Sequence, residues 1–328
     1  MGRTWWRWAR LPAGAAILAV LVWRVGTGPF LRGIHTVDGW SLMAAAGIAL
    51  VTTVCSAWRW SLVARGLGVA VRLGPATAAY YRSQFLNTVL PCGVLGDVHR
   101  AVTHGRDAGD VGRGLRAVGW ERSAGQLVQA VLAMIVLLAF PSPVHAAMPE
   151  VTGIAVLLVL VGPAVSRRLP RGGASRWART VRAASTDLRN GLLAPHAWPG
   201  IVAASVVVVT GHAATFLIAA RAAGVSASPA RMLPLALLIL LAMGVPANIG
   251  GWGPREGVAA WTFGAAGLGA AEGIATAVVY GVLVLVANLP GALVLAAASW
   301  SNGASRRSEE LQNSGSPAVA ELEGAACG

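Results

Sequence analysis

The sequence contains no lysine and few charged residues of any kind. All 26 of its basic residues are arginines, and charged residues make up only 12% of the chain. A typical soluble domain carries about 25% charged residues. Hydrophobic residues reach 55%, and the mean hydropathy is +0.63. This shortage of charge excludes an ordinary soluble enzyme and predicts an integral membrane protein.

Cysteine and the common catalytic motifs are equally scarce. Cys55, Cys92 and Cys327 show neither disulfide nor metal-ligand spacing. The histidines are scattered, and the sequence has no Walker motif, no H-E-x-x-H and no nucleophile elbow. We therefore expect no metal, no other cofactor and no catalytic residue.

Long apolar runs dominate what is present. Spans of about 20 apolar residues suffice to cross a bilayer, and we place them near residues 11–29, 40–64, 119–140, 149–166, 198–220 and 271–299. The first span is expected to stay as an uncleaved anchor.

Two shorter apolar runs, 76–96 and 230–249, meet breaks at Pro91 and Pro246. A break at membrane depth is tolerated only where protein or a water-filled cavity surrounds it, so we interpret both runs as re-entrant hairpins. The predicted fold class is all-α: a polytopic membrane protein with about six to eight transmembrane helices, two re-entrant hairpins and an internal repeat.

Arginine placement predicts the topology. The N-terminus, the C-terminal tail and the loops 65–75, 97–118 and 167–197 carry most arginines, whereas 141–148 carries none. The positive-inside rule places the arginine-rich segments in the cytoplasm, with both termini there and with 141–148 and 221–230 outside. The loop 167–197 is either an amphipathic helix on anionic headgroups or a solvated basic loop.

The composition, rich in Ala, Gly, Val and Arg, is typical of a GC-rich bacterial genome. We therefore expect a multi-pass protein of the bacterial plasma membrane. Arginines concentrated between apolar spans favour orientation and anionic lipid headgroups over nucleic acid.

An internal repeat relates the two halves of the chain. Segments 65–69 and 221–225 both read R-x-x-G-V. A Pro-Ala pair, a second proline, a glycine and an arginine follow in the same order, at Pro75, Pro91, Gly96 and Arg100 and again at Pro229, Pro246, Gly251 and Arg255. The copies start on opposite faces by the span count, which predicts an inverted-topology repeat with halves of about 40–140 and 198–299. Such repeats place substrate at their interface; the alternative is a duplication kept only for packing.

Charged residues gather at the two breaks and at the start of the 119–140 span. Each costs about 2.5–3.5 kcal/mol at membrane depth and persists when paired or facing a cavity. The expected pairs are Asp97 with Arg100, Glu121 with Arg122, and Arg255 with Glu256. Arg24 and Arg59 are expected to reach a span end instead.

Arginine binds phosphate through a bidentate fork, and glycines let backbone N–H groups approach an anion. The candidate lipid-headgroup residues are Arg82, Asn87, Gly96, Asp97, Arg100, Glu121, Arg122, Asn248, Gly250, Gly251, Gly253, Arg255 and Glu256. Among them, Arg100 and Arg255 are expected to hold the phosphate. The alternative is a set of salt bridges that only fix the hairpins.

These motifs resemble the transmembrane flippase-like domain of bacterial lysylphosphatidylglycerol synthases and its stand-alone relatives. The matching residues are Ser83 to Asn87, Pro91, Gly96, Asp97, Arg100, Glu121, Arg122 and the stretch 250–257. The sequence departs from the pattern at Cys92 and Leu95, where glycines are expected. The resemblance covers roughly residues 10–300 and implies lipid translocation between leaflets. We expect a membrane domain over 1–300, a disordered tail over 301–328, and no synthesis of lysylphosphatidylglycerol.

The favoured function is translocation of an anionic phospholipid or a polyprenyl-phosphate-linked lipid. The alternative is a membrane glycosyltransferase or other lipid-modifying enzyme, since the superfamily includes proteins linked to polyprenyl-phosphate sugar transfer; Asp97 or Glu256 would then be a base or metal ligand. A non-transporting scaffold is the third reading. Membrane lipids are the expected partners, and a homo-oligomer or a separate lipid-modifying enzyme stays open.

Overall fold

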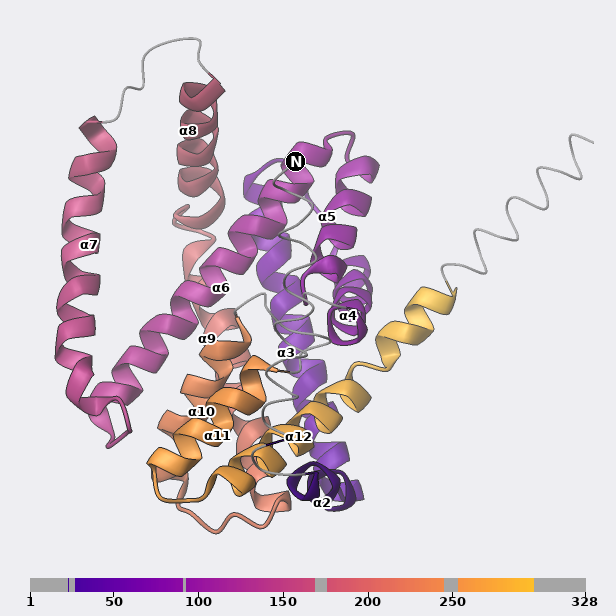
Figure 1. Cartoon of the computed structure of the whole chain (residues 1–328). Coiled ribbons are helices and arrows are strands. Elements are labelled where there is room, and N and C mark those ends of the chain that lie inside the picture. The colour runs from indigo at the N-terminus through magenta and orange to yellow at the C-terminus, as the bar shows by residue number, and fades with distance from the viewer. Residues whose placement is uncertain (1–22, 24–26, 91–92, 169–175, 245–252, 298–328) are drawn as a thin grey trace, which may run out of the picture.

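The computed structural model describes Trp23 and residues 27–90, 93–168, 176–244 and 253–297. Every regular element within these residues is helical (Figure 1). The first half contains α2 (Gly28–His35), α3 (Gly39–Gly66), α4 (Leu73–Val89), α5 (Leu95–Asp107) and α6 (Val111–Ala139). The connection contains η1 (His145–Ala147), α7 (Met148–Arg168), α8 (Arg176–Asp187) and the π-helical turn η2 (Leu188–Leu192). The second half contains α9 (Trp198–Ala222), α10 (Pro229–Met243), α11 (Pro254–Ala265) and α12 (Ala270–Ala287).

The all-α, polytopic membrane fold is confirmed. Within the described residues, 4 helical segments are long and apolar enough to cross a membrane: Gly39–Gly66, Val111–Ala139, Trp198–Ala222 and Ala270–Ala297. They match four of the expected spans, and α7 covers the expected span 149–166. The span 11–29 lies largely outside the described residues.

Helix α6 begins at Val111, well before the expected start near 119. Asp110 caps it, because its carboxylate accepts a hydrogen bond from the Arg113 backbone N–H at 2.8 Å. Together with α5, this makes most of 97–118 helical rather than a loop. The prediction of a loop was therefore wrong there, although its cytoplasmic location stays a prediction.

Two short helices flank each proline break, α4 and α5 at the first and α10 and α11 at the second. The runs 76–96 and 230–249 were expected to contain both arms of each hairpin. In the structure each run holds mainly the first arm, and the return arm extends to Asp107 or Ala265. The re-entrant course of these pairs stays a prediction.

Both halves follow one order: a long helix, two short helices and a long helix. Figure 1 shows α4 and α5 in the upper half of the molecule and α10 and α11 in the lower half. The two leading long helices, α3 and α9, pack against each other. Two apolar clusters are buried, one around Trp60 and Val63 mainly from the first half and one around Phe216 and Leu283 mainly from the second. Residues such as Leu137 and Ile201 contribute to the cluster of the other half.

Close backbone contact holds the first hairpin together at Gly96. A Cβ at this position would lie 2.0 Å from the Ser83 carbonyl oxygen, so only glycine permits this approach of α5 to α4. The Gly96 backbone N–H also donates to Asn87 Oδ1 at 2.8 Å. Gly96 and Asn87 therefore fix the geometry from which Asp97 projects.

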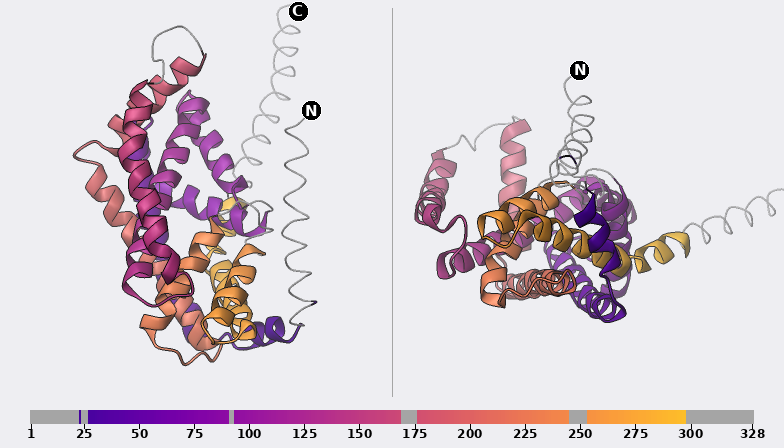
Figure 2. Two further views of the ribbon diagram at one scale, coloured as in Figure 1. Left: turned by 60° about the vertical axis from the view of Figure 1, so that its left-hand side comes forward. Right: turned by 60° about the horizontal axis from the view of Figure 1, so that its bottom comes forward.

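The basic segment 167–197 is largely helical, since it contains α8 and η2 and is not a plain loop over these residues. Asp187 joins it to α6 through a 2.8 Å ion pair with Arg116. The views in Figure 2 place α7 and α8 on the opposite side of the molecule from α12. The expected disordered tail, 301–328, lies outside the described residues.

Candidate functional site

Five charged side chains meet where α3, α5 and α6 cross in the first half. We call this the charge cluster, and its members are Arg59, Asp97, Arg100, Glu121 and Arg122. All but Arg122 are buried. Because ionised groups are costly to remove from water, each must find partners inside the protein.

Glu121 is the centre of the charge cluster and is 0% exposed. Its Oε1 atom accepts hydrogen bonds from Arg59 Nε at 2.9 Å, from Arg59 Nη2 at 2.5 Å and from the Tyr80 hydroxyl at 2.9 Å. Its Oε2 atom accepts one from Arg100 Nη2 at 3.1 Å. One carboxylate thus ties α6 to α3, α4 and α5.

The expected pairing of Glu121 with Arg122 is wrong. Consecutive residues on a helix point in directions about 100° apart, and Arg122 instead forms an ion pair with Asp97. Adjacency in the sequence therefore predicted the wrong partner for both Glu121 and Arg122.

Asp97 is saturated with donors. Its Oδ1 atom accepts from Ser83 Oγ at 2.9 Å and from Arg100 Nη2 at 3.1 Å. Its Oδ2 atom accepts from Asn87 Nδ2 at 2.9 Å and from Arg122. A carboxylate has about four acceptor positions, so this one is filled. The expected pair of Asp97 with Arg100 is confirmed.

Arg100 is sealed between aromatic rings. Its guanidinium carbon lies 4.0 Å from the centroid of the Tyr80 ring and 4.5 Å from that of Trp60. Cation–π contact of this kind stabilises a guanidinium away from water. Arg100 is therefore buried in the protein core.

Arg59 belongs to the charge cluster and does not reach a span end as expected. Its Nη1 atom donates to Ser205 Oγ on α9 at 3.0 Å. Gly125 provides the space, since a Cβ there would lie 2.8 Å from the same nitrogen. An arginine within an apolar span, flanked by Trp58 and Trp60, was the signal that could have identified this role.

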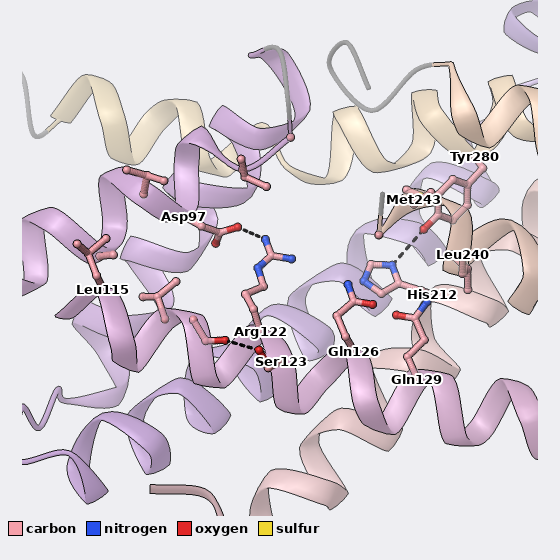
Figure 3. Close-up of a pocket in the computed structure, with 17 residues that line it drawn as sticks. Asp97, Leu115, Arg122, Ser123, Gln126, Gln129, His212, Leu240, Met243 and Tyr280 are labelled. Atoms are coloured by element: carbon pink, nitrogen blue, oxygen red, sulfur yellow. Dashed lines mark hydrogen bonds and ion pairs between the residues drawn. The ribbon is translucent and has the colours of Figure 1, made fainter. Parts of the chain in front are cut away.

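A cavity of about 780 Å³ adjoins the charge cluster at the interface of the two halves (Figure 3). Helices α5 and α6 line it from the first half, and α9, α10 and α12 from the second. Its polar lining consists of Asp97, Arg122, Ser123, Gln126, Gln129, His212 and Tyr280. Figure 3 shows them in a row from Asp97 and Arg122 towards His212 and Tyr280.

Arg122 is the member of the charge cluster whose guanidinium faces this cavity. Its side chain is 42% exposed, and its Nε atom has no hydrogen-bond partner within the described residues. Three guanidinium groups and two carboxylates leave the cluster with one excess positive charge. The cavity therefore presents a cation that a single anion would neutralise.

His212 and Tyr280 form the far end of the cavity. His212 Nδ1 and the Tyr280 hydroxyl lie 3.2 Å apart, so this hydrogen bond joins α9 to α12. Both residues come from the second half, so polar side chains of both halves line the cavity.

Within the described residues of the second half, Arg255 and Glu256 form a buried ion pair. Arg255 Nε and Nη2 donate to Glu256 Oε1 at 2.8 and 2.5 Å, and the Gly253 N–H donates to Oε2 at 2.7 Å. Gly253 has a φ of 113°, which favours glycine at this N-cap. A Cβ at Gly281 would lie 2.4 Å from Arg255 Nη2, so this glycine accommodates the guanidinium.

The expected Arg255–Glu256 pair is thus confirmed, and both residues are buried outside the cavity lining. Glu256 contacts its own helix terminus, and no bond to Arg100 joins the halves within the described residues.

The candidate residues therefore separate into groups. Asp97 and Arg122 line the cavity. Outside the lining, a hydrogen-bond network that holds α5 and α6 in place contains Asn87, Gly96, Arg100 and Glu121. Arg82 lies on α4 outside the lining, and Asn248, Gly250 and Gly251 fall outside the described residues. Gln126 and Gln129 were missed, although with Arg122 they follow an i, i+4, i+7 spacing that marks one helix face.

Comparison with known proteins identifies the family. Neither the curated proteins nor the solved structures gave a match. The family described as "Lysylphosphatidylglycerol synthase TM region" matches residues 8–291, which is most of the chain. The helical architecture fits this description, with long apolar helices and ionised groups held in the interior. The chain is a member of the lysylphosphatidylglycerol synthase transmembrane-region family, a membrane protein related to lipid handling.

Proposed function

We propose that this protein moves a lipid between bilayer leaflets by passing its phosphate-bearing headgroup through the cavity between the two halves. The lipid is an anionic phospholipid or a polyprenyl-phosphate-linked lipid. The observation that carries the proposal is Arg122, a guanidinium that faces a cavity of about 780 Å³ beside a cluster with one excess positive charge.

Electrostatics favour an anion at this position. A guanidinium offers donors in a fork that matches phosphate oxygens. Its attraction for an anion is stronger in a partly desolvated cavity than in bulk water. The N-terminus of α5 adds positive potential, because Gly93 and Val94 at its start also line the cavity.

Position within the fold also supports transport. The cavity is lined by both repeat halves and adjoins the ends of α5 and α10, where the two breaks begin or end. In inverted-repeat transporters, substrate binds at such an interface beside discontinuous helices.

The lipid-modifying alternative has less support. A general base needs an oxygen lone pair that is available to the substrate. Asp97 already accepts four hydrogen bonds, and Glu256 is buried against Arg255 and Gly253. These contacts favour a role in positioning for both carboxylates.

Translocation of a fluorescent anionic phospholipid in proteoliposomes tests the proposal. We expect Arg122→Gln to slow it by about tenfold to a hundredfold, which corresponds to the loss of a charged hydrogen bond of about 1.5–3 kcal/mol. The translocation rate of Arg122→Lys should lie between those of Arg122→Gln and the wild type, because lysine keeps the positive charge and loses the guanidinium fork.

The matched control is Arg116→Gln, which removes an arginine from the same helix outside the cavity. It should transport at the wild-type rate. Wild-type transport by Arg122→Gln would overturn the proposal.

A further inference from the structure

We infer that the cavity accepts a neutral, hydroxyl-rich headgroup joined through a phosphodiester, such as a polyol or a sugar, and disfavours a cationic aminoacyl headgroup. This inference rests on the proposed function, and it concerns the part of the headgroup beyond the phosphate.

The first reason is that, among the described residues, the cavity offers a cation no carboxylate with a free acceptor position. Within the described residues, its charged lining consists of Asp97 and Arg122. The four acceptor positions of Asp97 are occupied. An ammonium group entering the cavity would lose hydration beside a cluster with excess positive charge, and no acidic partner would compensate it.

The second reason is the pair of amides beyond Arg122. Gln126 and Gln129 project from α6 into the cavity (Figure 3). Within the part of the chain that the structure describes, neither amide forms a hydrogen bond to another residue. Amides in the apolar part of a membrane helix are costly unless they are hydrogen-bonded, so they are expected to bind water or a ligand.

The spacing of these residues suits one extended headgroup. At a rise of 1.5 Å per residue, Gln126 lies about 6 Å and Gln129 about 10 Å along the helix from Arg122. A phosphate held by Arg122 would therefore place the attached group next to the amides. Each amide both donates and accepts hydrogen bonds, as a hydroxyl does, whereas an ammonium only donates.

Binding of three synthetic lipids with identical acyl chains tests the inference, measured by native mass spectrometry on the full chain in detergent. Phosphatidylinositol has the phosphodiester and hydroxyls. Phosphatidylmethanol has the phosphodiester alone, and lysylphosphatidylglycerol has a cationic headgroup. We expect phosphatidylinositol to bind about tenfold more tightly than either of the others, the gain of one or two hydrogen bonds.

The double variant Gln126→Leu/Gln129→Leu should lose this preference, so that phosphatidylinositol binds no more tightly than phosphatidylmethanol. If it fails to fold, the single variants Gln126→Ala and Gln129→Ala should each lose part of the preference. Gln84→Leu is the matched control, because the Gln84 amide bonds to Thr53 at 2.9 Å outside this cavity. It should keep the full preference.

The results separate the two proposals. Equal binding of lysylphosphatidylglycerol and phosphatidylinositol, or an unchanged preference in the glutamine variants, would overturn the headgroup inference. The proposed function would survive if Arg122→Gln still weakened binding of every phosphodiester lipid. Lipid binding that is indifferent to Arg122→Gln would overturn both.

Discussion

The two halves use buried arginines in different ways. In the second half, Arg255 and Glu256 form a neutral pair in the first turn of α11. In the first half, Glu121 and Asp97 are shared among three arginines, and one of these faces a cavity. The comparison indicates that two halves with the same helix order can differ in whether, among the described residues, a buried arginine faces a cavity.

Each half also has a glycine that makes room for a buried arginine, and the two arginines come from different kinds of helix. Gly125 and Gly281 each occupy a long helix and leave room for a guanidinium. The guanidinium beside Gly125 belongs to Arg59 on the long helix α3. The guanidinium beside Gly281 belongs to Arg255 on the short helix α11. The space is therefore similar in both halves, but the arginine that fills it comes from a different element.

The largest effect on stability should come from Glu121→Gln. Two arginines would lose their shared carboxylate, and leaving buried charges without a partner costs about 3–5 kcal/mol. We expect a large drop in melting temperature in detergent. Adding Arg59→Gln should restore only part of it, because Arg100 still lacks that carboxylate. Full recovery in this double variant would contradict the shared arrangement.

Glu256→Gln should be the next most damaging change. It removes the charge that pairs with Arg255 and replaces the carboxylate that accepts the Gly253 N–H with a neutral amide. Since Arg255 and Glu256 neutralise each other's charge, adding Arg255→Gln should restore a larger share of the melting temperature than the first-half double variant does. Equal recovery in the two halves would remove the contrast between them.

Gly96→Ala should cost less, about 1–3 kcal/mol, as overpacking does. The added Cβ would meet the Ser83 carbonyl oxygen and must push α5 away from α4. Because Asp97 follows directly, transport should fall together with stability. Gly74→Ala is the control, since a Cβ there meets no atom within 4 Å. A wild-type melting temperature for Gly96→Ala would contradict the close packing.

The smallest effect should come from Arg116→Gln. This pair with Asp187 is partly exposed, and such pairs contribute about 0–1 kcal/mol. The melting temperature should change little, and high salt should reduce even that difference. A drop comparable to that of Glu121→Gln would show that α8 is coupled to the charge cluster.

Much of the architecture followed from the sequence. Apolar length predicted the four segments that can cross a membrane, and the proline breaks predicted where the short helices separate. The hairpin arms were misjudged, because α5 carries Asp97, His99 and Arg100 and does not look apolar. Its burial comes from the partners that these side chains find on other helices, and hydropathy cannot show that.

The site was predictable only where partners are close in the chain. Asp97 and Arg100 lie three residues apart on one helix face, so their pair could be foreseen. Arg59 and Glu121 are 62 residues apart, and only the crossing of α3 and α6 brings them together. Once Arg59 and Arg100 occupy Glu121, Arg122 is left to Asp97 and the cavity, which no local rule could indicate.

Thiol labelling of Ser123→Cys tests the central claim most directly. Ser123 lines the cavity next to Arg122, and Cys55, Cys92 and Cys327 would be replaced by serine. The account predicts that an impermeant thiol reagent labels position 123 from the cytoplasmic side. Phosphatidylinositol should block the labelling, and the block should disappear with Arg122→Gln. Absence of labelling from either side, or labelling that no phosphodiester lipid prevents, would contradict a headgroup site between the two halves.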